Sequence, residues 1–167
     1  ADFKVVYQAL HQFTWINKQR VGIMASSFGA CAALACPTIM NECRVLGLKS
    51  PCCFLPDAYL GEIGVPRWID WVRTGFCEEN GYDISVFFDA FKYNVYQDAK
   101  AITSRCLITH GSADEVVPFA QSLYLKEFLS GESELIVFDN GDHGYTGDNW
   151  EKMADIFEKF FMTELRD

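Results

Sequence analysis

The stretch Val21–Gly29, with the sequence VGIMASSFG, decides the fold of this chain. An apolar run over residues 21–25 leads directly into two serines, and a segment rich in alanine and cysteine follows. A short apolar run that ends in a tight turn and continues as a helix is the setting in which proteins expose a reactive serine. The stretch therefore predicts a strand, a sharp turn that carries a nucleophile, and a helix over residues 29–36.

Two neighbouring serines compete for the tip of this turn. A nucleophile on so tight a turn needs small residues two positions before it and two positions after it, where the chain presses against the neighbouring strand and helix. Ser27 has Ala25 and Gly29 at these positions, whereas Ser26 has a methionine and a phenylalanine. Ser27 is therefore the predicted nucleophile, and a serine that only caps the following helix is the alternative.

A serine hydroxyl needs an adjacent base to act as a nucleophile near neutral pH, so a histidine and a carboxylate should follow. Residues 110–118 (HGSADEVVP) come directly after the apolar run 106–109, and residues 140–145 (NGDHGY) follow the run 134–138. Both segments leave the carboxyl ends of expected strands, where ligands bind in parallel sheets. Along the chain the order is serine, aspartate, histidine. Other folds that combine a catalytic serine, histidine and aspartate carry them in different orders.

These segments resemble those of the α/β-hydrolase superfamily, in particular its serine esterases and prolyl-oligopeptidase-like members. The hallmark stretches read LITHGSADEVVPF and FDNGDHGY, and the likeness to the carboxyl-terminal portion of such enzymes extends over nearly the whole chain. The resemblance implies that Asp114 orients the imidazole, that His143 is the general base and acid, and that the backbone N–H of Phe28 is one oxyanion-hole donor. It implies neither a metal nor an organic cofactor.

Other titratable residues near these motifs have plainer interpretations. Glu115 and Asp142 adjoin the chosen residues and are the alternative triad acids, but each is expected to face solvent or to cap a turn. His110 is expected to shape its loop. His11 is expected to lie at the surface or at the edge of the core.

The apolar runs together predict the fold class. Four short runs, each bounded by turn signals, have the pattern of buried parallel strands: residues 21–25, 45–48, 106–109 and 134–138. Helical patterns cover residues 2–16, with Asp2 as the cap and a stripe through Phe3, Val6, Leu10 and Phe13, and also residues 29–36, 119–129 and 150–165. This order predicts an α/β fold with a parallel, doubly wound sheet of about four strands flanked by helices. By the resemblance, it corresponds to the C-terminal part of an α/β-hydrolase.

The connection over residues 51–103 is too long for a simple crossover between strands. It is rich in aromatic residues, unlike a disordered linker, and therefore predicts a structured cap inserted into a single domain that spans residues 1–167. Cys52 lies near the expected mouth of the site and is predicted to line the substrate pocket. Trp68, Trp71 and Phe87 are candidate pocket residues, with the core of the cap as their alternative place.

Composition restricts the partners. The formal net charge is −9 and no basic run is present, which argues against nucleic acid as a partner. The apolar runs are far shorter than the roughly 18 residues of a membrane span, so no membrane contact is expected. Seven cysteines without metal-ligand spacing suggest reduced thiols and a cytoplasmic location, with a regulatory disulfide as the alternative.

The resemblance also indicates what is missing. In the full family the sheet has about eight strands, and the second oxyanion donor comes from a loop after an early strand. Neither has a counterpart here, and the strand Val21 to Ala25 would be left as a bare apolar edge, which natural proteins avoid. We expect a piece of a longer enzyme, in which a missing N-terminal segment or a second copy covers this edge. A half-sized hydrolase that pairs its edge with another subunit is the alternative.

The expected function is a serine hydrolase that cleaves a small-molecule carboxylic ester. A short aromatic cap without a charged cluster favours small or aromatic acyl groups. A prolyl-oligopeptidase-like peptidase or a thioesterase is the enzymatic alternative. An inactive fragment or binding module that lacks the oxyanion loop is the alternative of a different class.

Overall fold

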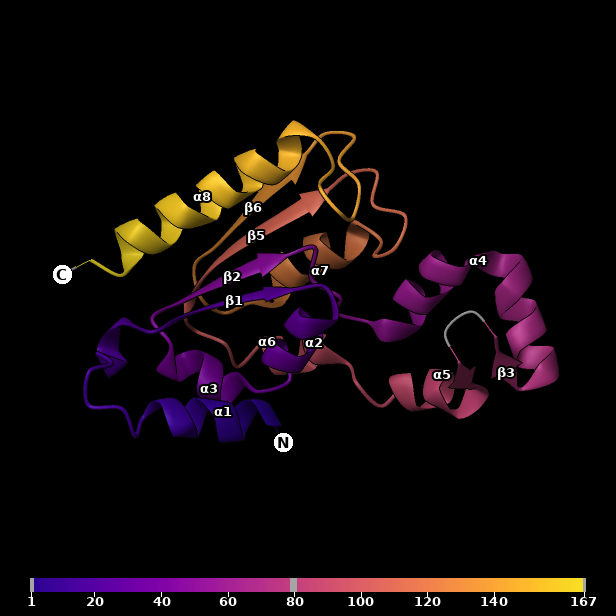
Figure 1. Cartoon of the computed structure of the whole chain (residues 1–167), viewed down its shortest axis with the longest axis horizontal. Coiled ribbons are helices and arrows are strands. Elements are labelled where there is room, and N and C mark those ends of the chain that lie inside the picture. Colours follow the sequence, from indigo (N-terminus) through magenta and orange to yellow (C-terminus); the bar gives the residue numbers. More distant parts are fainter. Residues whose placement is uncertain (1, 79–80, 167) are drawn as a thin grey trace.

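The computed structural model describes residues 2–78 and 81–166 and contains a parallel sheet at its centre (Figure 1). Its strands are β1 (Gly22–Ser26), β2 (Val45–Lys49), β5 (Arg105–Gly111) and β6 (Ser133–Phe138), in the order β1-β2-β5-β6. All three pairings are parallel. The four apolar runs thus form the strands that the sequence predicts, with ends that differ by one or two residues.

The register of the sheet aligns the strand ends that matter for function. Ser26 of β1 pairs with Lys49 of β2, and Lys49 pairs with Thr109 of β5. The segments after β1, β5 and β6 therefore all leave the sheet at the end where the strands have their carboxyl termini. Segments that are far apart in the sequence therefore lie close together in space.

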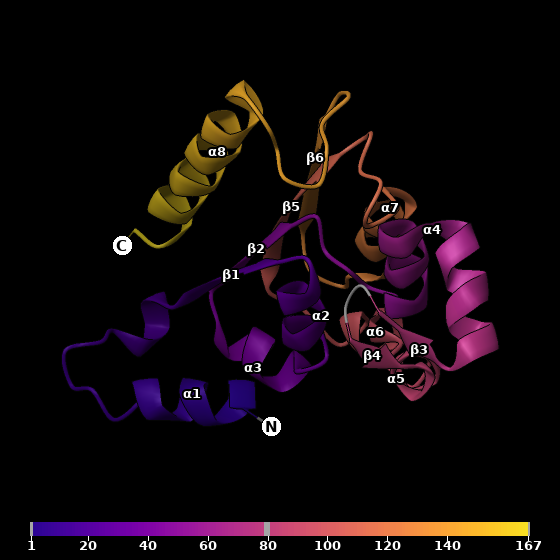
Figure 2. The ribbon, with the colours of Figure 1, turned by 45° about the vertical axis from the view of Figure 1, so that its right-hand side comes forward.

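Helices cover both faces of the sheet. On one face lie α1 (Asp2–Leu10), α2 (Phe28–Leu34), α3 (Pro37–Glu42), α6 (Val95–Ala99) and α7 (Ala120–Phe128). On the other lies α8 (Asp148–Glu164), as Figures 1 and 2 show. This helix packs so closely that a Cβ added at Gly22 would lie 2.7 Å from Phe161, and one added at Gly47 would lie 2.9 Å from Phe157.

One helix prediction is wrong in detail. The opening helix ends at Leu10 rather than continuing to residue 16, and it buries Tyr7 while Val6 stays exposed. The apolar residues of this segment suit two helix faces, and the one centred on Tyr7 meets the core. The proposed capping role of Asp2 concerns a side chain outside the described part of the structure. The helix predicted over residues 29–36 is confirmed as α2, and Pro37 begins the separate helix α3, which was not predicted.

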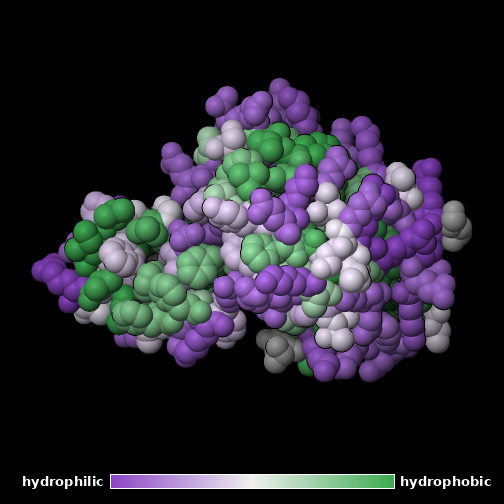
Figure 3. All heavy atoms as spheres, turned by 180° about the vertical axis from the view of Figure 1, so that it is seen from behind, coloured by the Kyte–Doolittle hydropathy of each residue, from purple (hydrophilic) through white to green (hydrophobic). Residues whose placement is uncertain are grey.

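The connection between β2 and β5 is an ordered unit beside the sheet, seen at the right of Figure 1. It contains α4 (Leu55–Thr74), the antiparallel pair β3 (Phe76–Cys77) and β4 (Tyr82–Asp83), and α5 (Ile84–Ala90) before α6. A kink divides α4 at Gly64, whose φ is 74°. Ile63, Trp71, Cys77 and Phe87 form a small core of this cap. Exposed apolar side chains gather between polar ones on the face of the cap seen at the left of Figure 3.

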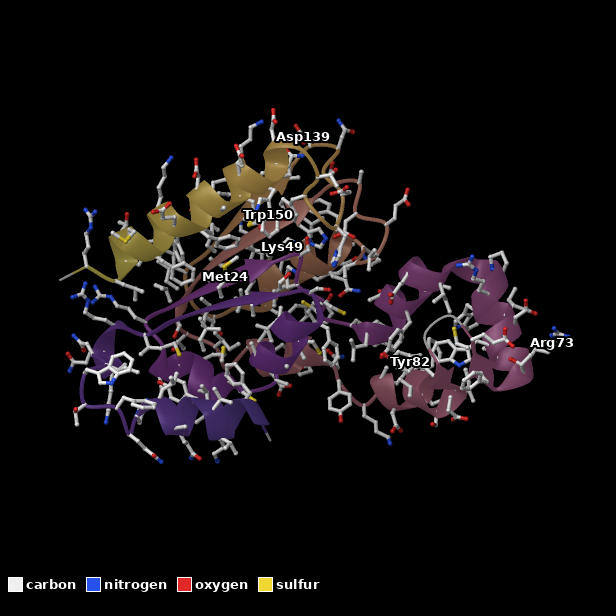
Figure 4. All side chains as sticks on the ribbon, in the orientation of Figure 1. Met24, Lys49, Arg73, Tyr82, Asp139 and Trp150 are labelled. Atoms are coloured by element: carbon white, nitrogen blue, oxygen red, sulfur yellow. The ribbon has the colours of Figure 1, made fainter. Side chains whose placement is uncertain are left out.

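Strand β1 is the edge strand of the sheet within the described residues, and β2 is its neighbour there. Met24, in the middle of β1, is 51% exposed (Figure 4). The prediction that another segment or a second copy covers this edge stays a prediction.

Among the helices of the described residues, none combines the length and the apolar character needed to cross a membrane. Within the described residues no disulfide joins the seven cysteines, and six of them are buried.

Candidate active site

The turn after β1 holds Ser27 in a conformation that non-glycine residues rarely adopt. Its φ is 51° and its ψ is −123°, so the backbone is strained at this residue. Hydrogen bonds on both sides hold the turn: the Ser27 N–H donates to the carbonyl of Lys49 at 3.0 Å, and the Cys52 N–H donates to the carbonyl of Ser27 at 3.1 Å. The Ser27 side chain makes no capping hydrogen bond to α2. The hydroxyl is therefore not used as a helix cap.

The structure changes the reason for choosing between the two serines. A Cβ added at Gly29 would meet no atom within 4 Å, so the expectation that this position must be small because it is crowded is wrong. The space beside the first turn of α2 is open. Ser27 is distinguished instead by its backbone geometry and by the residue that it faces.

Ser27, His143 and Asp114 form a continuous hydrogen-bonded array. The Nε2 atom of His143 lies 3.1 Å from Oγ of Ser27, and its Nδ1 atom lies 2.7 Å from Oδ2 of Asp114. Ser27 follows β1, His143 follows β6 and Asp114 follows β5, so the sheet register brings all three to the carboxyl end of the sheet. The histidine side chain is 23% exposed, whereas that of Asp114 is fully buried.

Asp114 is held as a carboxylate by its partners. Its Oδ1 atom accepts the N–H groups of Val116 and Val117 at 3.0 and 2.8 Å, and Nε2 of His110 lies 3.2 Å from Oδ2. Burial alone raises the pKa of Asp114, but the hydrogen bonds from His110, His143 and Val117 outweigh burial and keep the pKa below its usual range. The acid is thus ionised and oriented toward His143.

The alternative acids lie elsewhere. Glu115 is exposed, and Asp142 accepts hydrogen bonds from the N–H and hydroxyl of Thr146 at 2.9 and 2.7 Å, which closes a turn. His110 is buried and contacts the hydroxyl of Ser122 at 2.6 Å, in keeping with a role in shaping its loop. His11 packs on Tyr7, with ring centroids 4.7 Å apart.

A pocket of about 360 Å³ opens beside Ser27. Ser27, Phe28 and Cys52 line it, so Cys52 occupies the place expected from the sequence. The remaining lining residues are Leu55, Ala58, Tyr59, Glu62, Tyr82, Val116 and Val117. Trp68, Trp71 and Phe87 are absent from this lining and pack against one another inside the cap instead. The candidate pocket role of these three aromatic residues is therefore not supported, and the alternative, a cap core, describes them.

Two residues beside the array escaped the sequence analysis. Lys49 ends β2 and is buried, with its ammonium group 2.7 Å from the carbonyl oxygen of His143. Tyr145 is also buried, and its hydroxyl donates to that of Thr109 at 3.0 Å. The available signal was a lysine at the end of an otherwise apolar strand, LGLK, close to the serine turn.

Comparison with solved structures shows the fold. Est1E from Butyrivibrio proteoclasticus matches with a TM-score of 0.73 and 18% identity, over 98% of this chain and 68% of that one. Acetyl xylan esterase 1 from Thermoanaerobacterium sp. JW/SL YS485 matches with a TM-score of 0.71 and 20% identity, over 99% of this chain and 52% of that one. The Pyrococcus horikoshii acylaminoacyl peptidase matches with a TM-score of 0.72 and 20% identity, over 97% of this chain and 27% of that one.

The chain therefore spans about half of the acetyl xylan esterase and about a quarter of the peptidase. A search of curated protein sequences found no match. The sequence pattern of the prolyl oligopeptidase family matches residues 1–166, which is nearly the whole chain. The chain belongs to the prolyl oligopeptidase family, within the α/β-hydrolases.

Proposed function

We propose that this chain carries the catalytic centre of a serine hydrolase that cleaves carboxylic esters through an acyl-enzyme. The observation that carries this proposal is the array in which Ser27, His143 and Asp114 are joined by contacts of 3.1 and 2.7 Å. A hydroxyl on a strained turn, a histidine at hydrogen-bonding distance and a buried carboxylate behind it are the parts that nucleophilic catalysis requires.

In the proposed reaction, Oγ of Ser27 attacks the acyl carbon while its proton moves to Nε2 of His143. Asp114 stabilises the imidazolium ion through the contact to Nδ1. The tetrahedral intermediate then expels the alcohol, which takes the proton from Nε2. Water attacks the resulting acyl-enzyme with the same base, releases the carboxylic acid and restores Ser27.

The negative oxygen of the intermediate needs hydrogen-bond donors. Phe28 is the first residue of α2, so its N–H has no acceptor within the helix and is free to be one donor. We place the second donor in a part of the protein beyond these 167 residues, because the chain spans about half of the acetyl xylan esterase. One such donor contributes about 3 kcal/mol to the transition state, or roughly a hundredfold in rate.

The pocket beside Ser27 favours a small or aromatic acyl group. Leu55, Ala58, Val116 and Val117 supply apolar walls, and about 360 Å³ is near the lower limit of ligand pockets. Tyr59, Tyr82 and Glu62 supply polar atoms at the same pocket. Glu62 would repel an acidic acyl group, which favours neutral esters. Two of the structural neighbours are named as esterases.

The experiment that tests this proposal compares p-nitrophenyl esters of increasing acyl size with aminoacyl-prolyl amides. We expect kcat/KM to be higher for acetyl and benzoyl esters than for any amide. Preference for the amides would instead favour the second candidate, a peptidase. The family match and the acylaminoacyl peptidases among the structural neighbours favour that candidate.

A further inference from the structure

Lys49 occupies an unusual place for a charged side chain. It ends β2, between Ser26 of β1 and Thr109 of β5, and is only 7% exposed. Figure 4 shows it at the end of the strand, near the loop that joins β6 to α8. Lysine is almost never buried to this degree without partners, because desolvation disfavours the ammonium ion.

Its partners all belong to the surroundings of His143. The ammonium group donates a hydrogen bond to the carbonyl oxygen of His143 at 2.7 Å and lies 4.7 Å from the ring centroid of Tyr145. Both distances fit favourable interactions of a cation, with a carbonyl dipole and with an aromatic face. Burial lowers the pKa of Lys49, and the nearby carboxylates of Asp114 and Asp142 oppose this effect.

The loop that carries His143 needs such support. Asn140, Tyr145 and Gly147 all have positive φ values, of 56°, 58° and 64°. The start of the loop is held by bonds from the N–H of Ala113 to the carbonyl of Gly141 and from the N–H of Asn140 to the hydroxyl of Ser112. Within the described residues, Lys49 is the side chain that holds the peptide of His143 itself.

Tyr145 completes this support on the same side. Its ring packs edge-on against Phe138, with ring centroids 4.8 Å apart. Its hydroxyl donates a hydrogen bond to Thr109, the neighbour of Lys49 in the sheet. The histidine is therefore fixed from two directions. Asp114 holds its ring, and Lys49 holds its backbone.

We propose that Lys49 is a positioning residue, whose hydrogen bond to the carbonyl of His143 keeps the imidazole between Asp114 and Ser27. This inference rests on the proposed function. Misplacement of a catalytic group by about 1 Å can cost roughly a hundredfold in rate. Loss of this bond should therefore slow the reaction at Ser27 while leaving the substrate pocket intact.

The test uses a fluorophosphonate probe on the full-length protein and separates the rate constant at saturation from the half-saturating concentration. Lys49→Met removes the donor but keeps a long unbranched side chain. We expect a 10- to 100-fold lower rate constant and a half-saturating concentration within threefold of the wild type. Lys152→Met, at an exposed lysine of α8, is the matched control and should behave as the wild type. Thermal melting verifies that each variant is folded, and Lys49→Leu, which also lacks a donor, replaces Lys49→Met if the latter does not fold.

The outcomes distinguish a failure of this inference from a failure of the proposed function. A wild-type rate constant in folded Lys49→Met would overturn this inference alone, as would a change confined to the half-saturating concentration. Absence of any modification at Ser27 in the wild-type protein would overturn the proposed function, and this inference with it.

Discussion

Replacing Asp114 with asparagine should abolish most of the activity for a reason that the hydrogen bonds define. Oδ1 of this residue accepts the N–H groups of Val116 and Val117, and the asparagine oxygen can keep both bonds. The new NH₂ group then occupies the place of Oδ2, 2.7 Å from Nδ1 of His143. An amide NH₂ donates and does not accept, so it selects the imidazole tautomer whose proton is on Nε2.

That tautomer cannot take a proton from Ser27. Its Nε2 atom, 3.1 Å from the serine oxygen, is already protonated. The expected loss in kcat is on the order of 10⁴-fold, which corresponds to about 5.5 kcal/mol of activation free energy. Binding should change little, since Asp114 does not line the pocket.

The assay is hydrolysis of a short p-nitrophenyl ester at pH 7 by the full-length protein. Asp142→Asn is the matched control, because this neighbouring carboxylate bonds to Thr146 instead of to the histidine. It should retain activity within about tenfold of the wild type, in the range of ordinary loop effects. An Asp114→Asn variant that keeps a tenth or more of the activity would refute the reasoning, and so would equal losses in the two variants.

Four further predictions concern stability, the loop, the pocket and the sheet edge. The pKa of Asp114 is lower in the folded protein than in the unfolded chain, where its carboxyl ionises at pH ~4, so its ionisation should stabilise the fold above this pH. This contribution should be lost as the pH falls below ~4 toward the pKa of the folded state. The difference in melting temperature between the wild type and Asp114→Asn should therefore shrink below pH ~4. Gly111→Ala would place a Cβ 2.2 Å from the carbonyl oxygen of Gly141, so we expect a loss of ~1–3 kcal/mol in unfolding free energy together with lower activity, and unchanged melting and activity would contradict this. Cys52→Phe should fill the pocket and lower kcat/KM for benzoyl esters by roughly 10- to 200-fold relative to acetyl esters, whereas equal effects on both would argue against the assigned pocket. The edge of β1 should be paired in the full-length protein, either with another segment or with a second copy, and rapid amide hydrogen exchange along β1 in that protein would count against this pairing.

Much of the fold could be predicted because buried parallel strands have a simple sequence pattern. Residues 45–48 and 106–109 carry no charged residue and one polar side chain, that of Thr109, and the structure buries them in the two central strands. The segments around Asp114 and His143 were recognisable because they follow strand ends, where the topology must bring them together. Local pattern and overall fold agree at these positions.

The details that failed depend on tertiary contacts. The buried face of α1, centred on Tyr7, is decided by what this helix contacts, which the spacing of apolar residues does not reveal. Trp68, Trp71 and Phe87 pack in the core of the cap instead of lining the pocket beside Ser27. Lys49 was overlooked because a single lysine at a strand end is ordinarily a surface residue, and its burial depends on a loop 94 residues away in sequence.

The most direct test of the central claim is to locate the site of covalent modification by a fluorophosphonate probe. The full-length protein would be labelled, digested and analysed by mass spectrometry, with Ser27→Ala and Ser26→Ala treated in parallel. We predict one adduct, on Ser27, that is lost in Ser27→Ala and retained in Ser26→Ala. An adduct on Ser26, or labelling that survives in Ser27→Ala, would contradict the assignment of Ser27 as the nucleophile.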